Sequence, residues 1–464
     1  MRITVVGCGY VGLVAAACYA ELEHEVICVD NSAEKIAALQ AGETPIHEEF
    51  LPELLKDYGG KTLRFTTALP EAVRASSVIF IAVGTPPCAS GEADLSSVES
   101  VAREIAQSLT GYKVVVEKST VPVSTNDAIR RVMSLNKGAR GAFDVISNPE
   151  FLREGTAVID FLYPDRIVIG SDSERATALL QQVYCPLTDG SYYKRKDAIP
   201  APDHARIPAP LVLTSAASAE LIKHASNAFL AMKISFINAV ASICETVGAD
   251  VEEVRTGMGL DSRIGPRFLH PGIGYGGSCF PKDLSAFRAV ARESGYDFRL
   301  LEEVMRINEE QKQRFLRKLR KALWTLKGKH VGVLGLAFKG GTDDIRESPA
   351  IGIVESLLQE GVEITAYDPA AMDRAEQVLP PTVKFACDAY AAAEEVDALV
   401  ILTDWEEFAN LDLRRLRPLM HYPIIVDGRN LYDPSALAKY GFFYMSVGRP
   451  DMIPQRAPNV RRVA

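Results

Sequence analysis

Residues 3–30, ITVVGCGYVGLVAAACYAELEHEVICVD, decide the fold of the N-terminal part of the chain. A short apolar run leads into the glycine pattern GCGYVG, an alanine-rich stretch follows to Glu21, and a second apolar run ends at Asp30. Strand, glycine turn, helix and strand in this order predict the βαβ unit that binds a dinucleotide. Its glycines permit a tight turn and let a pyrophosphate approach the helix N-terminus.

Asp30 indicates which dinucleotide to expect. It follows Gly12 by 18 residues, at the end of the second predicted strand, where a carboxylate accepts hydrogen bonds from the adenosine ribose hydroxyls. Such a carboxylate repels a 2′-phosphate, so we expect NAD rather than NADP, although Lys35 is a nearby cation that suits a phosphate. The expected cofactor contacts of this segment are Gly7, Gly9, Tyr10, Val11, Gly12, Asp30 and Lys35.

Composition narrows the class of protein. With 464 residues, 47% of them hydrophobic and 24% charged, the chain is long enough for two or three globular domains. A net charge of -9 argues against nucleic acid or an anionic membrane as a partner. The eight cysteines are scattered, without the spacing of a metal site or a disulfide framework, so we expect no metal and a reducing cytoplasm. Glycines break the N-terminal apolar run, and no segment reaches the roughly 18 uninterrupted apolar residues of a membrane span.

Further strands are expected at residues 78–83, 113–117 and 144–147, alternating with helices. This pattern predicts a parallel, doubly wound α/β sheet that continues to about residue 200. Ligand-binding loops follow the carboxyl ends of such strands. The three loops here begin with Gly84-Thr85-Pro86, with Lys118-Ser119-Thr120-Val121-Pro122, and with NPEFLREG at residues 148–155.

Residues 185–210 interrupt this pattern. Their second half contains four prolines, Pro200, Pro202, Pro208 and Pro210. A basic-aromatic patch, YYKRK at residues 192–196, precedes them, and the segment shows no periodicity. We interpret them as a solvated surface loop, with a partner-binding site as the alternative.

One long helix is expected from Thr214 to about Gly248, as the spine between two domains. Lys223 and Asn227 are four residues apart, so they share one face, which is polar within an otherwise apolar helix. A solvated stripe and an active-site face both fit this pattern.

Residues 268–283, FLHPGIGYGGSCFPKD, place Cys279 after four glycines. Glycines let the backbone turn tightly and come close to a ligand. Because a helix is expected to begin at Pro281 and run to about Gly295, Cys279 lies just ahead of a helix N-terminus and beside Lys282. Both favour a thiolate, the form of cysteine that attacks carbonyl groups. A buried cysteine that packs as a small apolar residue is the other interpretation.

A second α/β domain begins at Lys329. Strands are expected at residues 330–334, 364–367, 398–402 and 424–426. It lacks the GxGxxG pattern, which suggests nucleotide binding of a different kind. We expect domains at residues 1–210, 211–325 and 326–448, followed by a mobile tail at 449–464.

Three motifs resemble the nucleotide-sugar dehydrogenase family that includes the UDP-glucose 6-dehydrogenases. They are NPEFLREG at 148–155, ELIKHASNAFLAMKISFINA at 220–239 and GYGGSCFPKD at 274–283. The resemblance covers almost the whole chain. It implies an N-terminal NAD-binding Rossmann-type domain, a central long helix and a C-terminal Rossmann-like domain that holds the uridine diphosphate. It also implies oxidation of UDP-glucose to UDP-glucuronate with two NAD consumed, which supplies a precursor of polysaccharides.

The resemblance also implies roles for particular residues. Cys279 would carry the thiohemiacetal and the thioester. Lys223 and Asp283, with a water near Thr120, would supply the base that removes the alcohol proton. Glu150 would act as general acid and base, and Asn227 with Lys223 would stabilise each oxyanion. The further cofactor contacts would be Gly84, Thr85, Thr120, Glu154, Lys282 and Arg346. The substrate contacts would be Glu150, Phe151, Leu152, Arg153, Glu154, Lys223, Asn227, Arg263, Phe268, Leu269, His270, Pro271, Gly272, Gly276 and Lys339.

Other functions stay open at this point. Relatives that act on GDP-mannose or on N-acetylated UDP-sugars share the chemistry. A two-electron hydroxyacid dehydrogenase would not need Cys279, and a non-enzymatic NAD-binding regulator would not need Cys279, Lys223 and Glu150 together. Arg263 matches a family arginine that reaches the substrate of a neighbouring subunit, so a homodimer or larger homo-oligomer is expected.

Overall fold

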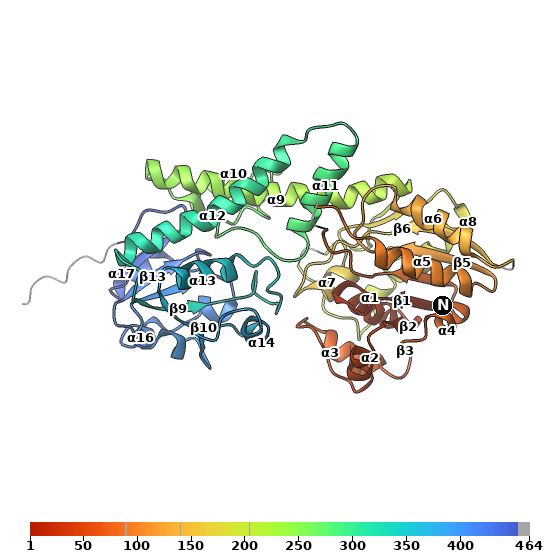
Figure 1. The fold of residues 1–464 in the computed structure, drawn as a ribbon, viewed down its shortest axis with the longest axis horizontal. Helices are drawn as coiled ribbons and strands as arrows, with labels where there is room; N and C mark the ends of the chain where they lie inside the picture. The colour runs from red at the N-terminus through yellow and green to blue at the C-terminus, as the bar shows by residue number, and fades with distance from the viewer. Residues whose placement is uncertain (89–90, 140, 204, 453–464) are drawn as a thin grey trace, which may run out of the picture. The chain divides into compact units, whose positions relative to one another are not determined.

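The computed structural model describes residues 1–88, 91–139, 141–203 and 205–452. The chain divides into two compact units (Figure 1). The N-terminal unit comprises residues 1–226 and 285–296, and the C-terminal unit comprises residues 227–284 and 297–464. Each unit is built around its own sheet.

The N-terminal unit contains an eight-stranded sheet in the order β3-β2-β1-β4-β5-β6-β7-β8. Its strands are β1 (Arg2–Val6), β2 (Glu25–Val29), β3 (Leu63–Thr66), β4 (Val78–Ile81), β5 (Tyr112–Glu117), β6 (Ala142–Ser147), β7 (Ile167–Gly170) and β8 (Leu211–Thr214). The predicted α/β class and doubly wound sheet are confirmed. The prediction of an entirely parallel sheet is wrong at one place, because β7 pairs antiparallel to β6 through Ser147 and Gly170. The connection between these strands holds only the six-residue helix α7 (Ala157–Leu162), whereas parallel neighbours need a longer crossover.

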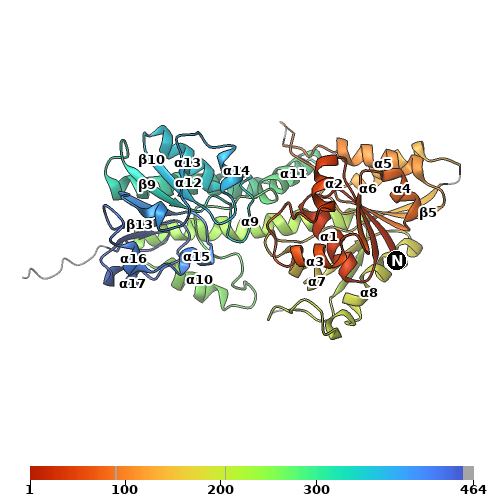
Figure 2. The ribbon, with the colours of Figure 1, turned by 90° about the horizontal axis from the view of Figure 1, so that it is seen from below.

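Helices cover both faces of this sheet, as Figure 2 shows from below. They are α1 (Tyr10–Glu21), α2 (Ala33–Gln40), α3 (Leu51–Tyr58), α4 (Leu69–Ala75), α5 (Ser96–Ser108), α6 (Thr125–Asn136), α7 and α8 (Glu174–Thr188). Alternate residues of one strand enter different cores: Val78 and Phe80 pack with α1 and α8, while Ile79 and Ile81 pack with α4, α5 and α6. The continuous apolar run of β4 therefore reflects burial on both faces.

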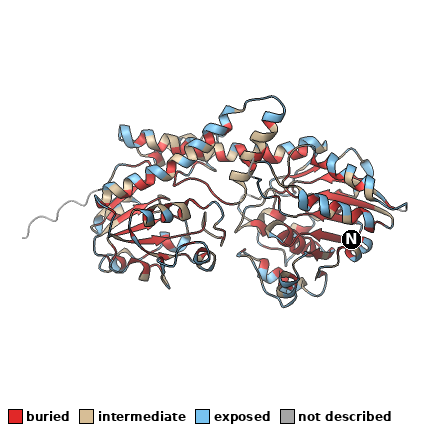
Figure 3. Cartoon of the chain, viewed as in Figure 1, coloured by how far each residue is buried: buried red, intermediate tan, exposed pale blue. Residues whose placement is uncertain are grey.

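The segment predicted as a solvated loop is anchored at its start, so that prediction is wrong there. Helix α8 runs on to Thr188, and a short 3₁₀ turn, η1 (Tyr192–Lys194), follows. The Tyr192 side chain is only 1% exposed and packs in the core of the N-terminal unit. Figure 3 shows that the strands of both sheets are mostly buried (red), whereas exposed residues (pale blue) lie on the helices and loops around them. Arg195 donates from its Nη1 to the carbonyl oxygen of Glu21 at 2.7 Å. The basic-aromatic patch thus secures this segment to the domain.

The long central helix is confirmed as α9, Ala216–Val247, with 32 residues. By length and composition it is apolar enough to cross a membrane, and 44% of its most apolar window is buried inside the structure. The buried core helix of a globular protein meets the same criteria. Its residues 216–226 belong to the N-terminal unit, and the remainder belongs to the C-terminal unit. Helix α11 (Phe280–Glu293) is likewise shared between the two units.

The C-terminal unit has a six-stranded sheet in the order β11-β10-β9-β12-β13-β14, with every pair parallel. Its strands are β9 (His330–Leu334), β10 (Glu363–Tyr367), β11 (Lys384–Phe385), β12 (Ala398–Ile401), β13 (Ile424–Asp427) and β14 (Phe443–Ser446). Its other helices are α10 (Val251–Gly259), α12 (Arg299–Leu323), α13 (Pro349–Gln359), α14 (Met372–Glu376), α15 (Glu406–Ala409), α16 (Leu413–Leu416) and α17 (Pro434–Lys439), besides the turn η2 (Ala391–Ala393). The predicted second Rossmann-like domain is confirmed.

The start of the predicted mobile tail is packed. Arg449 is 8% exposed and donates to the carbonyl oxygen of Tyr432 at 2.9 Å. Met452 pairs with Tyr444 through main-chain hydrogen bonds of 2.9 and 3.0 Å. The prediction of mobility is therefore wrong for residues 449–452, and residues 453–464 lie outside the described residues.

Candidate functional site

The dinucleotide fingerprint leaves the N-terminus of α1 accessible. Gly7 has a φ of +104°, and a Cβ there would overlap the main chain at Ala82, while a Cβ at Gly12 would overlap the carbonyl oxygen of Gly7. Gly9 has no atom within 4 Å of a Cβ position, and α1 begins directly after it at Tyr10. The first and third glycines are thus required by packing. The second leaves room for a pyrophosphate at the positive end of the helix.

Asp30 lies at the end of β2 and is 8% exposed. Its carboxylate accepts the main-chain N–H of Cys8 at 2.8 Å and that of Ser32 at 3.0 Å, and it pairs with Lys35 Nζ at 3.0 Å. Burial alone would raise the pKa of Asp30, but the N–H donors of Ser32 and Cys8 together with Lys35 outweigh it and hold the pKa below its usual value. Asp30 is therefore a fixed anion at the place where NAD carries its adenosine ribose, and these residues fit that cofactor.

Glu48 joins the fingerprint to the NPEFLREG loop, and sequence reasoning missed it. Its buried carboxylate accepts the Tyr10 hydroxyl, the main-chain N–H of Gly155 at 2.8 Å and that of Val158 at 3.3 Å. Glu48 stands outside every recognised motif, and an acid in a segment without periodicity gives no signal of such contacts. The bonds hold the loop that carries Glu150 against the nucleotide-binding turn.

Glu150 and Lys223 form a buried ion pair within the N-terminal unit. Their side chains are 4% and 5% exposed, and Lys223 Nζ lies 2.7 Å from Glu150 Oε1. The second oxygen of Glu150 accepts the main-chain N–H of Leu152 at 2.6 Å. Phe151 packs under Arg166, whose guanidinium lies 3.5 Å from the ring centroid. The predicted polar face of the long helix is therefore a buried one at Lys223.

Lys118 is a second buried cation near this pair. Its Nζ donates to Asn148 Oδ1 at 3.2 Å, and the Tyr184 hydroxyl donates to the same oxygen at 2.6 Å. Burial lowers the pKa of Lys118 to about 8, with Glu150 opposing and Lys223 reinforcing that effect. The side chain is poised to hold or release a proton near neutral pH.

The two other predicted ligand loops of the sheet are tied together. Thr85, in the loop after β4, donates to the carbonyl oxygen of Thr120 at 2.8 Å. Ser119 donates to the carbonyl oxygen of Val83 at 2.7 Å. Gly84 and Thr120 therefore belong to one connected edge of the sheet, at the carboxyl ends of its strands.

Cys279 lies immediately before α11 in the C-terminal unit. Its carbonyl oxygen accepts the main-chain N–H of Asp283 at 2.8 Å, which is the first hydrogen bond of that helix. The residue is half-buried, and Ser278 Oγ lies 3.7 Å from its sulfur. The predicted position at a helix N-terminus is confirmed to within one residue, and the helix dipole there favours a negatively charged sulfur.

Asp283 organises the polar groups of the same helix turn. It is fully buried and accepts Asn227 Nδ2 at 2.6 Å. Lys282 Nζ lies 2.8 Å from its other oxygen. Asn227 and Asp283 are thus brought together within the C-terminal unit, and Lys282, expected at the cofactor, pairs with Asp283.

The four glycines before Cys279 have neighbours within the protein itself. A Cβ at Gly276 would overlap the carbonyl oxygen of Glu347, and one at Gly277 would lie 2.8 Å from the ring of Phe338. Gly272 and Gly274 face Gly428 and Asn308 in the same way. The sequence suggested that these glycines make room for a ligand, whereas here each makes room for the C-terminal unit's own main chain or side chains.

The remaining predicted contacts are distributed over the C-terminal unit. The Arg346 guanidinium donates to both carboxylate oxygens of Asp344, and the shortest of these contacts is 2.6 Å. Lys339 Nζ lies 5.8 Å from the centroid of the Phe338 ring. In the segment before Cys279, Leu269, Pro271 and Gly272 are buried, His270 is exposed, and Phe268 adopts a φ of +63°.

Arg263 is exposed over 86% of its side chain and pairs with Asp261 at 2.6 Å. Within the described residues, no group of three or more His, Cys, Asp or Glu side chains is placed to hold a metal ion.

A dinucleotide fingerprint with a fixed acid after its second strand indicates an NAD-dependent dehydrogenase. Comparison with known proteins agrees. The chain matches the three models of one family: the NAD binding domain at residues 1–188, the central domain at 217–310 and the UDP binding domain at 332–434. The chain belongs to the UDP-glucose/GDP-mannose dehydrogenase family.

Individual relatives similar to this chain include dehydrogenases of two UDP-sugars. A UDP-glucose 6-dehydrogenase of Rhizobium meliloti is 47% identical over 456 residues, covering 97% of this chain and all of that protein. Among solved structures, a UDP-glucose dehydrogenase of Pyrobaculum islandicum is 38% identical, with a TM-score of 0.86, and covers 97% of this chain and 98% of its own. A UDP-D-ManNAc dehydrogenase of Pyrococcus horikoshii is 29% identical, with a TM-score of 0.81, and covers 97% and 99%.

Replacing Asp30 with asparagine should narrow the preference for NAD over NADP. Asparagine keeps an acceptor for the N–H of Cys8 but removes the charge that repels a 2′-phosphate, and it releases Lys35 to meet that phosphate. We expect the ratio of kcat/KM for NAD to that for NADP to fall by about tenfold, equivalent to about 1.4 kcal/mol. The control is Lys35→Ala, which keeps Asp30 and should retain the preference. A wild-type enzyme that prefers NADP would contradict the assignment.

Replacing Lys118 with methionine should stabilise the protein at pH 7. The pKa of Lys118 falls from 10.5 to about 8 on folding, so below pH 8 the folded state holds a disfavoured ammonium at a cost of about 3 kcal/mol. That cost fades between pH 8 and 10.5, because the folded protein has then already released the proton. The apparent melting temperature of Lys118→Met should exceed that of wild type at pH 7 and converge with it by pH 10.5. The exposed Lys56→Met is the control, and a gain of equal size at both pH values would refute the explanation.

Proposed function

We propose that this protein oxidises the C6 hydroxyl of UDP-glucose to the carboxylate of UDP-glucuronate. The observation that carries the proposal is Cys279 at the N-terminus of α11, one turn ahead of the buried Asp283 and its partner Asn227. A two-electron alcohol dehydrogenase has no need of a nucleophile at this position, whereas oxidation of an aldehyde to an acid does. The match to the UDP binding domain supports a UDP-sugar as the substrate. The 47% identical UDP-glucose 6-dehydrogenase supports glucose as its sugar.

The first oxidation needs a base for the alcohol proton, and we assign it to the Asp283 carboxylate, with the Lys223 ammonium stabilising the alkoxide that forms. Lys223 is held by Glu150 at 2.7 Å, so its charge is balanced in a site from which water is largely excluded. Asn227, four residues further along α9, holds Asp283 by its amide at 2.6 Å. When bound, NAD accepts the hydride of each oxidation. The chain's own residues orient the substrate and move the protons.

The second oxidation proceeds on sulfur. The Cys279 thiolate adds to the C6 aldehyde, and the resulting oxyanion is stabilised by Lys223 and Asn227. Loss of the second hydride leaves a thioester, and Glu150 activates the water that hydrolyses it. The sum is one alcohol, one water and two NAD converted to one carboxylate, two NADH and three protons.

Acid formation through Cys279 can be tested by stoichiometry. Wild type should yield two NADH per UDP-glucose without free aldehyde, because the intermediate stays on the sulfur. Cys279→Ala should abolish acid formation while UDP-glucose still binds, and Glu150→Gln should accumulate a covalent adduct that intact-protein mass spectrometry detects. UDP-glucuronate formation by Cys279→Ala at close to the wild-type rate would refute the thioester route. Activity on UDP-N-acetylmannosamine alone would reassign the sugar.

We further propose that the active protein is a homodimer packed through α9. On its C-terminal-unit portion, α9 exposes Phe229, Phe236 and Ile243, which are 58%, 51% and 61% exposed. They are seven residues apart, the spacing of a helix seam that packs against another helix. Such a stripe on a water-soluble surface calls for a partner, and a second copy supplies the same stripe.

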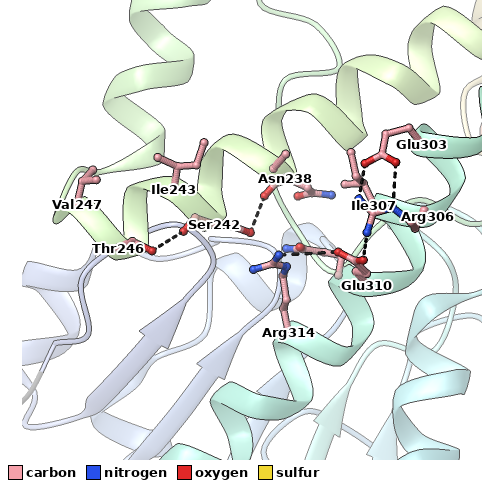
Figure 4. Close-up of a pocket in the computed structure, with 12 residues that line it drawn as sticks. Asn238, Ser242, Ile243, Thr246, Val247, Glu303, Arg306, Ile307, Glu310 and Arg314 are labelled. Atoms are coloured by element: carbon pink, nitrogen blue, oxygen red, sulfur yellow. Dashed lines mark hydrogen bonds and ion pairs between the residues drawn. The ribbon is translucent and has the colours of Figure 1, made fainter. Parts of the chain in front are cut away.

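A groove between α9 and α12 runs beside this stripe and has a volume of about 500 Å³ (Figure 4). Ile243, Thr246 and Val247 line one side, and charged residues of α12 line the other. These are Glu303, Arg306, Glu310 and Arg314. Because acids and bases alternate along the groove, a two-fold related copy can set its own acids against these bases.

Mixing two inactive variants should test the shared site. If Arg263 serves the neighbour's substrate, Arg263→Ala and Cys279→Ala are each inactive alone, but a mixed dimer contains one complete site. Unfolding and refolding an equal mixture should therefore restore about a quarter of wild-type activity, since half the dimers are mixed and each has one intact site of two. Sedimentation should report a dimer for both variants. No recovery in a mixed dimer of confirmed mass would contradict the role of Arg263.

The compartment is proposed as the cytoplasm. None of the eight cysteines, all of which lie in the described part of the chain, forms a disulfide, and a thiolate mechanism at Cys279 requires a reducing environment.

A further inference from the structure

Two buried acids beside the proposed site have no part in the mechanism above. Glu117 ends β5 and Glu220 lies in the first turns of α9, and each is 3% exposed. Their side chains line the same small cavity. Buried acids without a basic partner are rare in proteins, so their presence here calls for an explanation.

Glu220 caps the N-terminus of α6. The main-chain N–H groups of Ser124 and Asn126 each donate to one of its oxygens at 2.8 Å. Ser124 occupies the capping position with a φ of +79°, and its own side chain makes no capping hydrogen bond. Glu220 thus supplies the acceptor that α6 lacks. Burial raises the pKa of Glu220, while the N–H groups of Asn126 and Ser124 and the positive end of that helix favour its ionised form.

Glu117 must then carry the proton of the pair. An ionised carboxylate can only accept hydrogen bonds, so two carboxyl groups can bond to each other only when one is protonated. Burial and the neighbouring charge of Glu220 raise the pKa of Glu117 well above its usual value, while Ser147, which donates to Glu117 at 2.7 Å, acts in the opposite direction.

The pair adjoins the groups proposed to act on the substrate. Glu117, Glu220, Thr120 and Lys223 all line one small cavity of about 10 Å³. Glu117 begins the loop from β5 to α6 that carries Thr120, and Glu220 precedes Lys223 by three residues, which places them on one face of α9. A hydrogen bond between the acids would therefore join the loop to the helix at the position of these two residues.

We propose that neutral Glu117 donates a hydrogen bond to ionised Glu220, and that this pair positions Thr120 and Lys223 for catalysis. The catalytic part of this inference rests on the proposed function, whereas the shared proton does not. Both acids are positioning residues, because they act through the loop and the helix.

The other charged groups around the pair do not remove the need for the proton. Asp127 of α6 is a further anion facing Glu220. Lys223 is paired with Glu150, and Lys118 bonds to Asn148. Because the folded-state pKa of Glu117 is raised, its stabilising effect is complete below its unfolded value of about 4.5 and is lost as pH rises toward the folded value.

The proton can be observed directly without substrate. The infrared difference between wild type and Glu117→Gln at pH 7 should contain the C=O band of a protonated carboxyl that shifts in D2O. Glutamine keeps an N–H donor for Glu220 but cannot titrate, so its melting temperature relative to wild type should rise as pH rises from 5 to 9. Glu174→Gln, at an exposed site in α8, should show neither effect. Should Glu117→Gln fail to fold, the band must still be present in wild type at pH 7.

Positioning is tested by rescue. Glu117→Ala and Glu220→Gln should each lower kcat by at least tenfold with a smaller change in the KM for UDP-glucose, because the substrate contacts persist while the acting groups shift. Glu117→Gln should recover most of the activity that Glu117→Ala loses.

Three results would overturn the inference. Absence of the carboxyl band in wild type would remove the shared proton, and so would a melting-temperature difference that is constant from pH 5 to 9. A wild-type kcat in Glu220→Gln would show that the pair has no positioning role. If the wild-type protein has no activity on UDP-glucose, the proposed function is wrong, but the infrared test of the shared proton still stands.

Discussion

The ion pair between Lys223 and Glu150 is the constraint on which the buried polar cluster of the N-terminal unit depends. Both charges are almost completely buried, and removing two charges from water costs more than their attraction returns unless further hydrogen bonds complete the pair. Here the second oxygen of Glu150 is taken by the N–H of Leu152. Stability alone gives little reason to retain such a pair, because apolar residues of similar size often do as well. A requirement for a lysine that stays charged and correctly aimed gives a stronger reason.

In the C-terminal unit, close packing holds the backbone around Cys279 in place. Gly276 and Gly277 press directly against Glu347 and Phe338, so the segment before Cys279 is held by close packing as well as by hydrogen bonds. Helix α11 starts at the next residue, and its first hydrogen bond ends on the Cys279 carbonyl oxygen. Placement on a closely packed segment at a helix terminus fixes a side chain more accurately than a free loop can.

Sequence reasoning found the features that local chemistry specifies. The dinucleotide fingerprint at Gly7 to Gly12 needs glycines at particular positions, so the sequence predicts it. Pro281 is typical of the first turn of a helix, so the sequence also predicts the helix that begins after Cys279. The antiparallel β7 and the burial of Tyr192 depend on contacts between distant segments, and a basic-aromatic run looks the same whether it is solvated or anchored. Glu48, Glu117 and Glu220 were missed as functional residues for the same reason. An acid becomes meaningful only when its partners, such as the N–H groups of Gly155 or Ser124, are known in space.

The charges around Lys223 also limit how many protons this region can hold at once. Lys118 and Lys223 are both buried, and burial has already lowered the pKa of Lys118 to about 8. Two full positive charges there are balanced by Glu150 and Glu220, which leaves no stable place for a third anion at Glu117. Ionising Glu117 would set two buried carboxylates against each other and weaken the cap on α6, whereas keeping its proton leaves Glu220 free to bind Ser124 and Asn126. A neutral Glu117 and an ionised Glu220 therefore agree with the charge balance that the ion pair of Lys223 and Glu150 sets in this region.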